Sequence, residues 1–118
     1  MRIKIISCII IATLFLTCSC HKEPTTYYCG VSHPETELPW LKDLLKSSLC
    51  TFVYHFESAG QEYISITNCG QVDGMAVYYT CDGEKVCEIG GIANLNTCEE
   101  GFLNDFPSTG KLIYKQDK

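Results

Sequence analysis

The segment 38–48 has the apolar pattern of an amphipathic helix. Over residues 39–49, apolar side chains recur at positions 40, 41, 44, 45 and 49, with polar residues between them. This spacing follows the helical period of about 3.6 residues, which places one side of a helix in a core. Pro39 suits the first turn of a helix and Lys46 suits its last turn. The pattern therefore predicts one helix over residues 38–48.

After residue 49, apolar and polar residues alternate, which is the period of a β-strand. Two alternating segments joined by a short connection predict a hairpin, and the Asp82-Gly83 turn predicts a second one. The last segment carries lysines that suit an edge strand. The expected strands cover residues 50–57, 62–67, 75–81, 85–89 and 111–115.

Residues 92–110 are rich in Asn, Gly, Thr and Ser without a sustained period, so they predict a long loop stapled by Cys98. The expected fold class is therefore α+β, with one amphipathic helix packed on an antiparallel sheet of four to five strands and braced by disulfides. A chain of 118 residues is long enough for one such domain and too short for two.

The N-terminus has the layout of a secretory signal peptide. Arg2 and Lys4 precede an apolar run over residues 5–16, and a short run of Thr, Cys and Ser follows. The apolar run has about twelve residues, whereas a helix that crosses a bilayer needs about twenty. A signal peptide is therefore favoured over a permanent transmembrane anchor.

The end of this run, Leu16-Thr17-Cys18-Ser19-Cys20, resembles a bacterial lipobox. The resemblance implies that the cysteine after the cut becomes an acylated N-terminus, bearing a lipid such as palmitate. Ser19 before Cys20 is a more usual residue at the cut than Thr17 before Cys18, which indicates Cys20, with Cys18 as the alternative. The N-terminal lipid would make a membrane the first partner of the protein.

Nine cysteines in so short a chain indicate an oxidising compartment. Acylation of Cys20 leaves an even number of candidates for disulfides: Cys29, Cys50, Cys69, Cys81, Cys87 and Cys98. Acylation of Cys18 would leave one more thiol. Six cysteines allow about fifteen pairings, and sequence does not choose among them. The most local pair, Cys81 with Cys87, flanks the Asp82-Gly83 turn and is the bridge that we expect.

The chain divides into a lipoprotein signal peptide over 1–19, a polar tether over 20–34 and one small α+β domain over 35–118. Within the tether, residues 27–29 are expected to mark where order begins. The net charge is −5, and loss of the signal peptide leaves seven lysines against fourteen acids. This acidic balance, without a basic cluster, argues against nucleic acid as a partner.

Candidates for catalysis are few. His55 could act as a general base with Glu57, but its place in an alternating strand is better explained by a histidine on the more polar sheet face. His21 and His33 have no evident partner in the sequence. We therefore expect no catalytic residue and no enzyme activity.

The sequence also offers few candidate residues for binding a metal or a cofactor. Structural zinc sites and redox sites use Cys-x-x-Cys motifs, whereas five residues separate Cys81 from Cys87, the closest mature pair. The second half of the chain is acidic without an Asp-x-Asp-x-Asp calcium loop. We expect no metal and no cofactor. The acids considered as calcium ligands in this half are Asp73, Asp82, Glu84, Glu88, Glu99, Glu100 and Asp105.

Aromatic residues could form a platform for a carbohydrate or a peptide. Their spacing coincides with the helical and strand periods, which favours a place in the core. The residues concerned are Trp40, Tyr27, Tyr28, Tyr78, Tyr79 and Tyr114.

Two motifs together point to a family. Leu38-Pro39-Trp40-Leu41-Lys42 opens the expected helix, and Cys81-x5-Cys87 leads into Gly90-Gly91. In this combination, across about residues 31–115, the chain resembles the small uncharacterised cell-envelope lipoproteins of Bacteroides-type bacteria. The resemblance implies a lipid-anchored envelope protein and carries over no functional residue beyond the acylated cysteine. Lys22-Glu23 matches only part of the acidic motif associated with surface display, which leaves the periplasmic and surface faces of the outer membrane as alternatives.

These observations favour a cell-envelope lipoprotein that acts as a non-enzymatic binding module for a protein, a peptide or a glycan. The alternative is an inhibitor of a protease or lytic enzyme, in which the stapled loop 90–110 enters the cleft of its target, since a preorganised loop favours tight binding. A third hypothesis is an enzyme that uses His55 with Glu57 or another acid.

Overall fold

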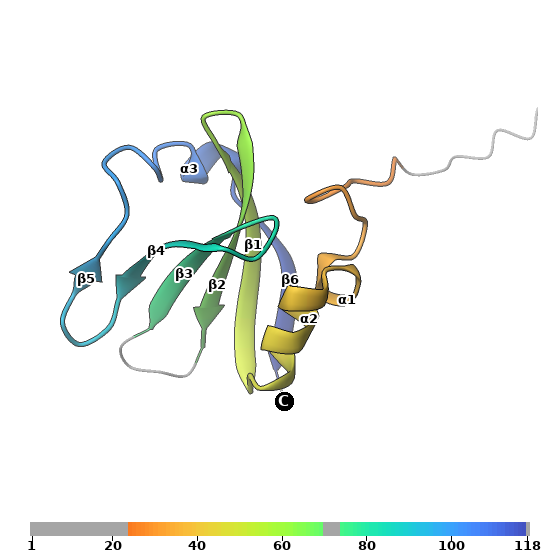
Figure 1. The fold of residues 1–118 in the computed structure, drawn as a ribbon, viewed down its shortest axis with the longest axis horizontal. Coiled ribbons are helices and arrows are strands. Elements are labelled where there is room, and N and C mark those ends of the chain that lie inside the picture. The colour runs from red at the N-terminus through yellow and green to blue at the C-terminus, as the bar shows by residue number, and fades with distance from the viewer. Residues whose placement is uncertain (1–23, 70–73, 118) are drawn as a thin grey trace, which may run out of the picture.

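The computed structural model describes residues 24–69 and 74–117, which form a six-stranded antiparallel sheet with short helices (Figure 1). The strands lie in the order β5-β4-β3-β2-β1-β6. The first five follow one another as a meander, and β6 returns to pair with β1. The elements are α1 (Pro34–Glu37), α2 (Pro39–Lys46), β1 (Cys50–Ser58), β2 (Gln61–Asn68), β3 (Met75–Thr80), β4 (Lys85–Gly90), β5 (Leu95–Asn96), α3 (Phe106–Thr109) and β6 (Lys111–Asp117).

The α+β class and the antiparallel sheet are confirmed, and the finer expectation is refined. The sheet has six strands instead of four to five, because the expected loop 92–110 contains β5. The same stretch contains α3, and α1 precedes the expected helix, which spans Pro39–Lys46. Elements of two to four residues are too short to show a period in a sequence.

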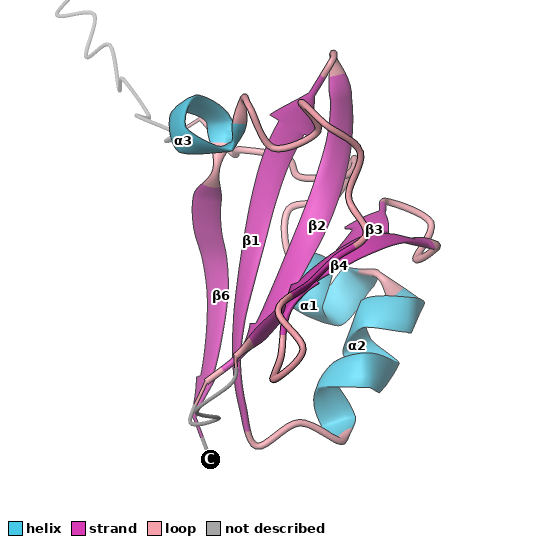
Figure 2. Cartoon of the chain, turned by 90° about the vertical axis from the view of Figure 1, so that its left-hand side faces the viewer, coloured by secondary structure: helices cyan, strands magenta, loops and turns pink. Residues whose placement is uncertain are grey.

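Helix α2 closes one face of the sheet, as the views in Figures 1 and 2 show. Its buried residues are Leu41 and Leu45, one turn apart, as the helical period predicts. They pack on Val53 of β1 and on Ile64 and Ile66 of β2, and we call this set the aliphatic core.

Trp40 fastens the start of α2 to the turn between β3 and β4. Its indole N–H donates a 2.9 Å hydrogen bond to the carbonyl of Cys81, and its ring lies 5.3 Å from that of Tyr79. Gly83 of the turn has a φ of +89°, and a Cβ there would lie 2.6 Å from the Trp40 ring. Glycine is therefore needed for both the conformation and the close approach.

The opposite face of the sheet buries a second core made mainly of aromatic rings. Phe56 at its centre is fully buried. Its ring lies within 6 Å of four others, at separations of 5.1–5.7 Å, and we call the five rings the aromatic cluster. Two rings come from strands and two from the chain after Cys98: Tyr63, Tyr78, Phe102 and Phe106.

The two cores share one sheet because side chains alternate along β1. Val53 points into the aliphatic core and Phe56 into the aromatic cluster. The register places Val53 opposite Ile66 and Phe56 opposite Tyr63, so each residue meets a partner of its own kind.

Three disulfides tie the fold together: Cys29–Cys81, Cys50–Cys69 and Cys87–Cys98. All six expected cysteines are paired, but the expected bridge between Cys81 and Cys87 is wrong. Cys87 lies opposite Tyr78 and belongs to the aromatic cluster's side of the sheet, whereas Cys81 joins Cys29, which packs on the aliphatic core. The two cysteines thus serve opposite faces, although they are close in sequence.

The edges of the sheet are β5, with two residues, and β6, which confirms the expected edge strand. The ladder between β1 and β6 shifts register at Val53/Tyr54. A short edge on one side, and an irregular edge with Lys111 and Lys115 on the other, discourage pairing with another sheet.

Candidate functional site

The turn between β4 and β5, residues 91–94, protrudes from the sheet, and we call it the hairpin tip. Asn94 donates its backbone N–H to the carbonyl of Gly91 over 3.0 Å, which closes a tight turn. Gly90, Gly91 and Asn94 have positive φ values of 115°, 78° and 50°. A Cβ at Gly90 would collide with the carbonyl of Gly74, so this position requires glycine.

Three sets of contacts brace the strands that carry the tip. The Cys87–Cys98 disulfide links them covalently. Thr97 donates its backbone N–H to the Glu88 carbonyl over 3.0 Å, and the Glu88 N–H donates to the Thr97 hydroxyl over 2.9 Å. The Cys98 N–H donates to the Asn96 side chain over 3.0 Å. The tip is therefore held in shape without help from a partner.

The hairpin tip presents apolar side chains to solvent. Ile92 is 89% exposed and Leu95, just beyond the tip, is 37% exposed. Residues 89–98 include no charged side chain. An exposed isoleucine on a braced, uncharged turn is a contact surface that needs little further ordering to bind.

The hairpin tip and the N-terminal segment lie on opposite sides of the domain. In Figure 1, β5 lies at the far left, and the orange segment that begins the described chain lies at the far right, beyond α1. Cys29 joins this segment to Cys81, and Tyr28 and Val31 bond to each other through their backbones at 2.8 and 3.1 Å. Residues 28–34, which fall within the expected tether, are thus attached to the domain.

His55 helps to attach this segment. Its Nε2 lies 3.0 Å from Oε1 of Glu62, and the same oxygen accepts a 3.1 Å hydrogen bond from the Cys29 N–H. The Tyr28 ring packs on the imidazole at 4.9 Å, and the Lys111 ammonium lies 5.5 Å from the centre of the Tyr28 ring. His55 is therefore buried between the sheet and the N-terminal segment.

The structure pairs His55 with Glu62, one of the other acids that the third hypothesis left open, and not with Glu57. Glu57 is exposed, and its backbone N–H donates a 3.0 Å hydrogen bond to the Thr109 hydroxyl. Glu62 lies opposite Glu57 on β2 and reaches His55 instead. In the described part of the chain, the cysteines that could have supplied a nucleophilic thiol are bonded to one another.

The aromatic candidates divide between the interior and the surface. Tyr78 is buried in the aromatic cluster, while Trp40, Tyr79 and Tyr114 pack against the aliphatic core. Tyr27 is exposed and Tyr28 covers His55.

Three side chains have shifted pKa values. Burial raises the pKa of the Tyr78 and Tyr79 phenols. The His33 backbone N–H lowers the pKa of the exposed Glu37 carboxyl by donating to it.

Within residues 24–69 and 74–117, His, Cys, Asp and Glu side chains form no group of three that could hold a metal ion. Glu88 pairs instead with Lys85 at 2.8 Å, and His33 lies 3.7 Å from Glu35. Asp73 and His21, which the sequence also offered, lie outside the described residues, as do Cys18 and Cys20.

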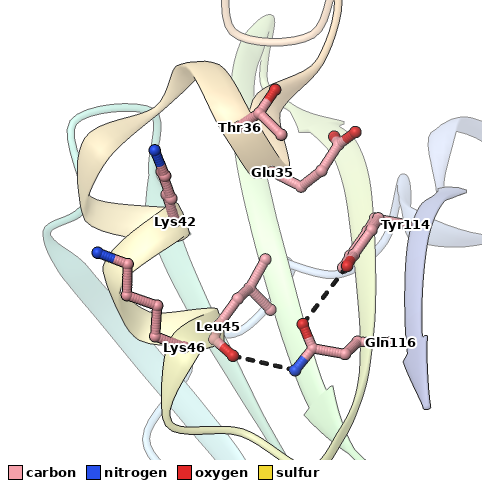
Figure 3. A pocket seen from close by; sticks show the side chains of 7 residues that line it. All are labelled: Glu35, Thr36, Lys42, Leu45, Lys46, Tyr114 and Gln116. Atoms are coloured by element: carbon pink, nitrogen blue, oxygen red, sulfur yellow. Dashed lines mark hydrogen bonds between the residues drawn. The ribbon is translucent and has the colours of Figure 1, made fainter. Parts of the chain in front are cut away.

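An open hollow of about 300 Å³ lies between the helices and β6 (Figure 3). Figure 3 shows Leu45 on its floor and Tyr114 and Gln116 of β6 on one side. The helices supply the rest of its lining, which consists of Glu35, Thr36, Lys42 and Lys46.

Sequence patterns did not single out the hairpin tip's Ile92, or Gln116 in the hollow. Ile92 follows Gly90-Gly91 between two cysteines, which is a readable sign of an apolar residue on a stapled turn. Gln116 is a polar residue near the end of an edge strand, and no pattern indicates that it is buried there.

No described helix is long and apolar enough to cross a membrane. No protein-family model, curated protein or solved structure is significantly similar to the chain.

Proposed function

We propose that this protein is a lipid-anchored, non-enzymatic binding module of the cell envelope, and that it contacts a partner protein through the hairpin tip. The lipobox-like segment ending at Cys20 supports the anchor. The observation that carries the binding function is Ile92, 89% exposed on a turn that the Cys87–Cys98 disulfide braces. The position of the tip, away from the segment that leads to the anchor, supports the same function.

Energetically, the tip suits an apolar pocket. Burying an exposed isoleucine contributes about 1.5–3 kcal/mol to binding. A turn that is already closed by a disulfide and backbone hydrogen bonds loses little conformational entropy on binding. Because residues 89–98 are uncharged, a pocket that receives the tip has no buried charge to neutralise.

Site-specific photo-crosslinking in the native cell tests this function. A benzophenone amino acid at position 92 is expected to give a discrete adduct with one envelope protein. Position 49 is the matched control, because Leu49 is also apolar, 76% exposed and next to a disulfide-bonded cysteine, Cys50. We expect no discrete adduct from position 49.

A second pair of variants separates binding from folding. With the crosslinker at position 95, Ile92→Asn is expected to abolish the adduct and Ile92→Val to retain it. No adduct at position 92, or the same adducts at positions 92 and 49, would contradict binding through the tip.

The alternative function, inhibition of a protease or lytic enzyme, is favoured by the same protruding, stapled loop. Because residues 91–94 form a tight turn, the tip would plug a cleft and would not lie along it as an extended substrate strand does. Assays against a panel of proteases and peptidoglycan hydrolases test this alternative. Inhibition that Ile92→Asn removes without unfolding the domain would support it, and no inhibition across the panel would count against it.

The anchor has its own test, because Cys18 and Cys20 are both candidates for acylation. We expect Cys20→Ala to release the protein from the membrane fraction and Cys18→Ala to leave it there. Release by Cys18→Ala alone would assign the lipid to Cys18, and retention of both variants would contradict lipid anchoring.

A further inference from the structure

Two turns at one end of the sheet enclose an open pocket of about 360 Å³, which we call the turn pocket. One turn joins β1 to β2, and both it and the chain that leads into α3 lie at the top of Figure 1. The other turn covers residues 99–102, where the Phe102 N–H donates to the Glu99 carbonyl at 3.1 Å. The Ser58 hydroxyl joins the two turns by donating to the Phe102 carbonyl at 2.8 Å. No residue of the hairpin tip lines this pocket.

The wall of the turn pocket includes two rings of the aromatic cluster. Tyr63 and Phe102 both line the pocket, and both are partly exposed. The Tyr63 ring stacks on Phe56 at 5.5 Å and meets Phe102 edge-on at 4.9 Å, so these contacts fix its position. Aromatic rings attract cations through their negative faces. A wall that is already in place needs little ordering when a ligand binds.

The charged residues that line the turn pocket are both acidic. Glu99 and Glu100 are exposed, and neither forms an ion pair within the described residues. A second pocket of about 290 Å³ also has Tyr63 in its lining, and we call it the adjoining pocket. Its charged residues are Glu62 and Asp82. Two neighbouring pockets are therefore lined by acids on either side of one aromatic ring.

Basic side chains offset little of this negative charge. The five described lysines lie on α2, β4 and β6, and none of them lines either pocket: Lys42, Lys46, Lys85, Lys111 and Lys115. Among the basic residues in 24–69 and 74–117, His55 alone reaches an acid of these linings, at 3.0 Å from Glu62. Charge complementarity therefore favours a cationic ligand.

Ser58 adds a buried acceptor to the turn pocket. The residue is 7% exposed, and its hydroxyl uses its proton in the bond to the Phe102 carbonyl. Among the described residues, no N–H or O–H group donates to this hydroxyl, so its lone pairs can accept from a ligand. A lysine ammonium has three N–H donors, which suit a hydroxyl oxygen beside carboxylates.

We infer that the two pockets bind a basic segment of a partner protein. One lysine side chain of the segment enters the turn pocket, where its apolar stem lies against Tyr63 and Phe102 and its ammonium bonds to the two glutamates and to Ser58. A second cationic side chain enters the adjoining pocket beside Asp82. Because Tyr63 belongs to both linings, a peptide with side chains on either side of this ring fills both pockets, whereas an unbranched amine does not. This site goes beyond the proposed function and does not depend on the hairpin tip.

Titration of the full chain in nonionic detergent micelles, followed by ¹⁵N NMR, tests the site. The probe is the peptide acetyl-Lys-Gly-Lys-amide, and its neutral match carries an acetyl group on both side-chain amines. We expect saturable shifts of the backbone amides in residues 59–60, 80–82 and 99–102 with the cationic peptide. The acetylated peptide should bind about fivefold or more weakly, and so should spermidine, which is cationic but unbranched.

Paired acid variants locate the interaction. Glu99→Gln with Glu100→Gln removes both acids of the turn pocket and should weaken binding of the cationic peptide about fivefold or more. The control, Glu84→Gln with Asp117→Asn, removes the same charge from exposed positions outside both pockets and should leave binding nearly unchanged. Asp82→Asn removes one acid of the adjoining pocket and should have an intermediate effect.

Variants of Tyr63 test the aromatic wall. Tyr63→Phe keeps the ring and should bind the cationic peptide as the wild type does. Tyr63→Leu removes the ring and should weaken binding. The glutamine variants keep both rings of the wall, so a loss of binding in them reports the charge and not the packing of the aromatic cluster.

Several outcomes would overturn the inference. Equal binding of the acetylated peptide would remove the role of charge, and equal binding of spermidine would assign the site to a free amine. Equal effects of the two double variants would reduce binding to the net charge of the domain, and no saturable shift would rule out the site. None of these results bears on the crosslinking from position 92, so the two proposals fail independently.

Discussion

The two faces of the sheet bury their cores by different means. On one face, Leu41 and Leu45 of α2 pack on aliphatic strand residues. The helix covers this face with side chains at the regular helical spacing. On the other face, the chain after Cys98 covers Phe56 with two rings, Phe102 and Phe106, that follow no regular period. The Cys87–Cys98 disulfide ties β4 to the start of this covering chain. An irregular loop can therefore cover a core when aromatic contact area and a disulfide take the place of the regularly spaced side chains of a helix.

The difference also separates two surface features. The helix-covered face carries the hollow, and the loop-covered face includes the braced strands that hold the hairpin tip. Loss of the aromatic cluster or its disulfide should therefore disturb the tip, and loss of the aliphatic core should disturb the hollow.

Truncation of one core residue on each face is expected to have the largest effect. Phe56→Ala should lower the free energy of unfolding by about 3–5 kcal/mol and Leu41→Ala by about 2–5 kcal/mol, because both residues are fully buried. Urea denaturation measures these values. A cost below about 1 kcal/mol for Phe56→Ala would show that the aromatic cluster is not a core.

Hydrogen exchange of the same two variants sharpens the comparison. Phe56→Ala should speed exchange of the amides in residues 98–109, and Leu41→Ala should speed exchange in α1 and α2. Equal acceleration in both regions by both variants would mean that the two faces open as one unit.

Removal of the Cys87–Cys98 disulfide is expected to have a somewhat smaller effect. The double variant Cys87→Ser with Cys98→Ser should cost about 3 kcal/mol, since the bridge closes a loop with a sequence separation of 11. It should also speed exchange in residues 91–105. The control, Cys50→Ser with Cys69→Ser, removes a bridge between β1 and the end of β2 and should leave exchange in 91–105 unchanged. Unchanged protection of 91–105 in the first variant would contradict bracing by the disulfide.

The smallest expected effect is an alkaline loss of stability through Tyr78. Burial raises the pKa of its phenol in the folded protein, whereas the unfolded chain releases this proton near pH 10. The contribution is therefore fully present below about pH 10 and is lost as the pH rises from there through the folded-state pKa. Tyr78→Phe removes this titration, so its stability should fall less than that of the wild type between pH 9 and 11.

Tyr79→Phe gives the same test on the helix-covered face. Burial also raises the pKa of Tyr79, but the nearby Lys85 opposes that shift. We expect Tyr79→Phe to reduce the alkaline loss by less than Tyr78→Phe does. Denaturation midpoints at a series of pH values measure both, and parallel curves for Tyr78→Phe and the wild type would contradict the prediction.

The helix-covered face was predictable because its contacts follow local periods. Positions 41 and 45 carry the helical period, alternation marks β1 and β2, and the Asp82-Gly83 turn lies between β3 and β4. Each of these features depends on residues close together in sequence, so the pattern and the structure agree.

The loop-covered face was not predictable because its contacts join residues far apart in sequence. Phe102 and Phe106 belong to a stretch rich in polar residues. Only their contacts with the Phe56 ring show that they are part of a core. The Cys29–Cys81 bridge spans 52 residues, and no local rule selects it over Cys81 with Cys87. Among the candidate sites, the hollow escaped prediction for the same reason, since Gln116 of β6 meets Leu45 of α2 across 71 residues of sequence.

Bracing by three disulfides and anchoring by one lipid are the features on which the proposed function rests. The intact mass of the native protein extracted from the membrane fraction, with and without reduction and alkylation, tests both at once. We predict a chain that begins at Cys20, carries a lipid increment and shows six alkylated thiols only after reduction. An unmodified chain with thiols that react before reduction would contradict both the anchor and the bracing of the hairpin tip.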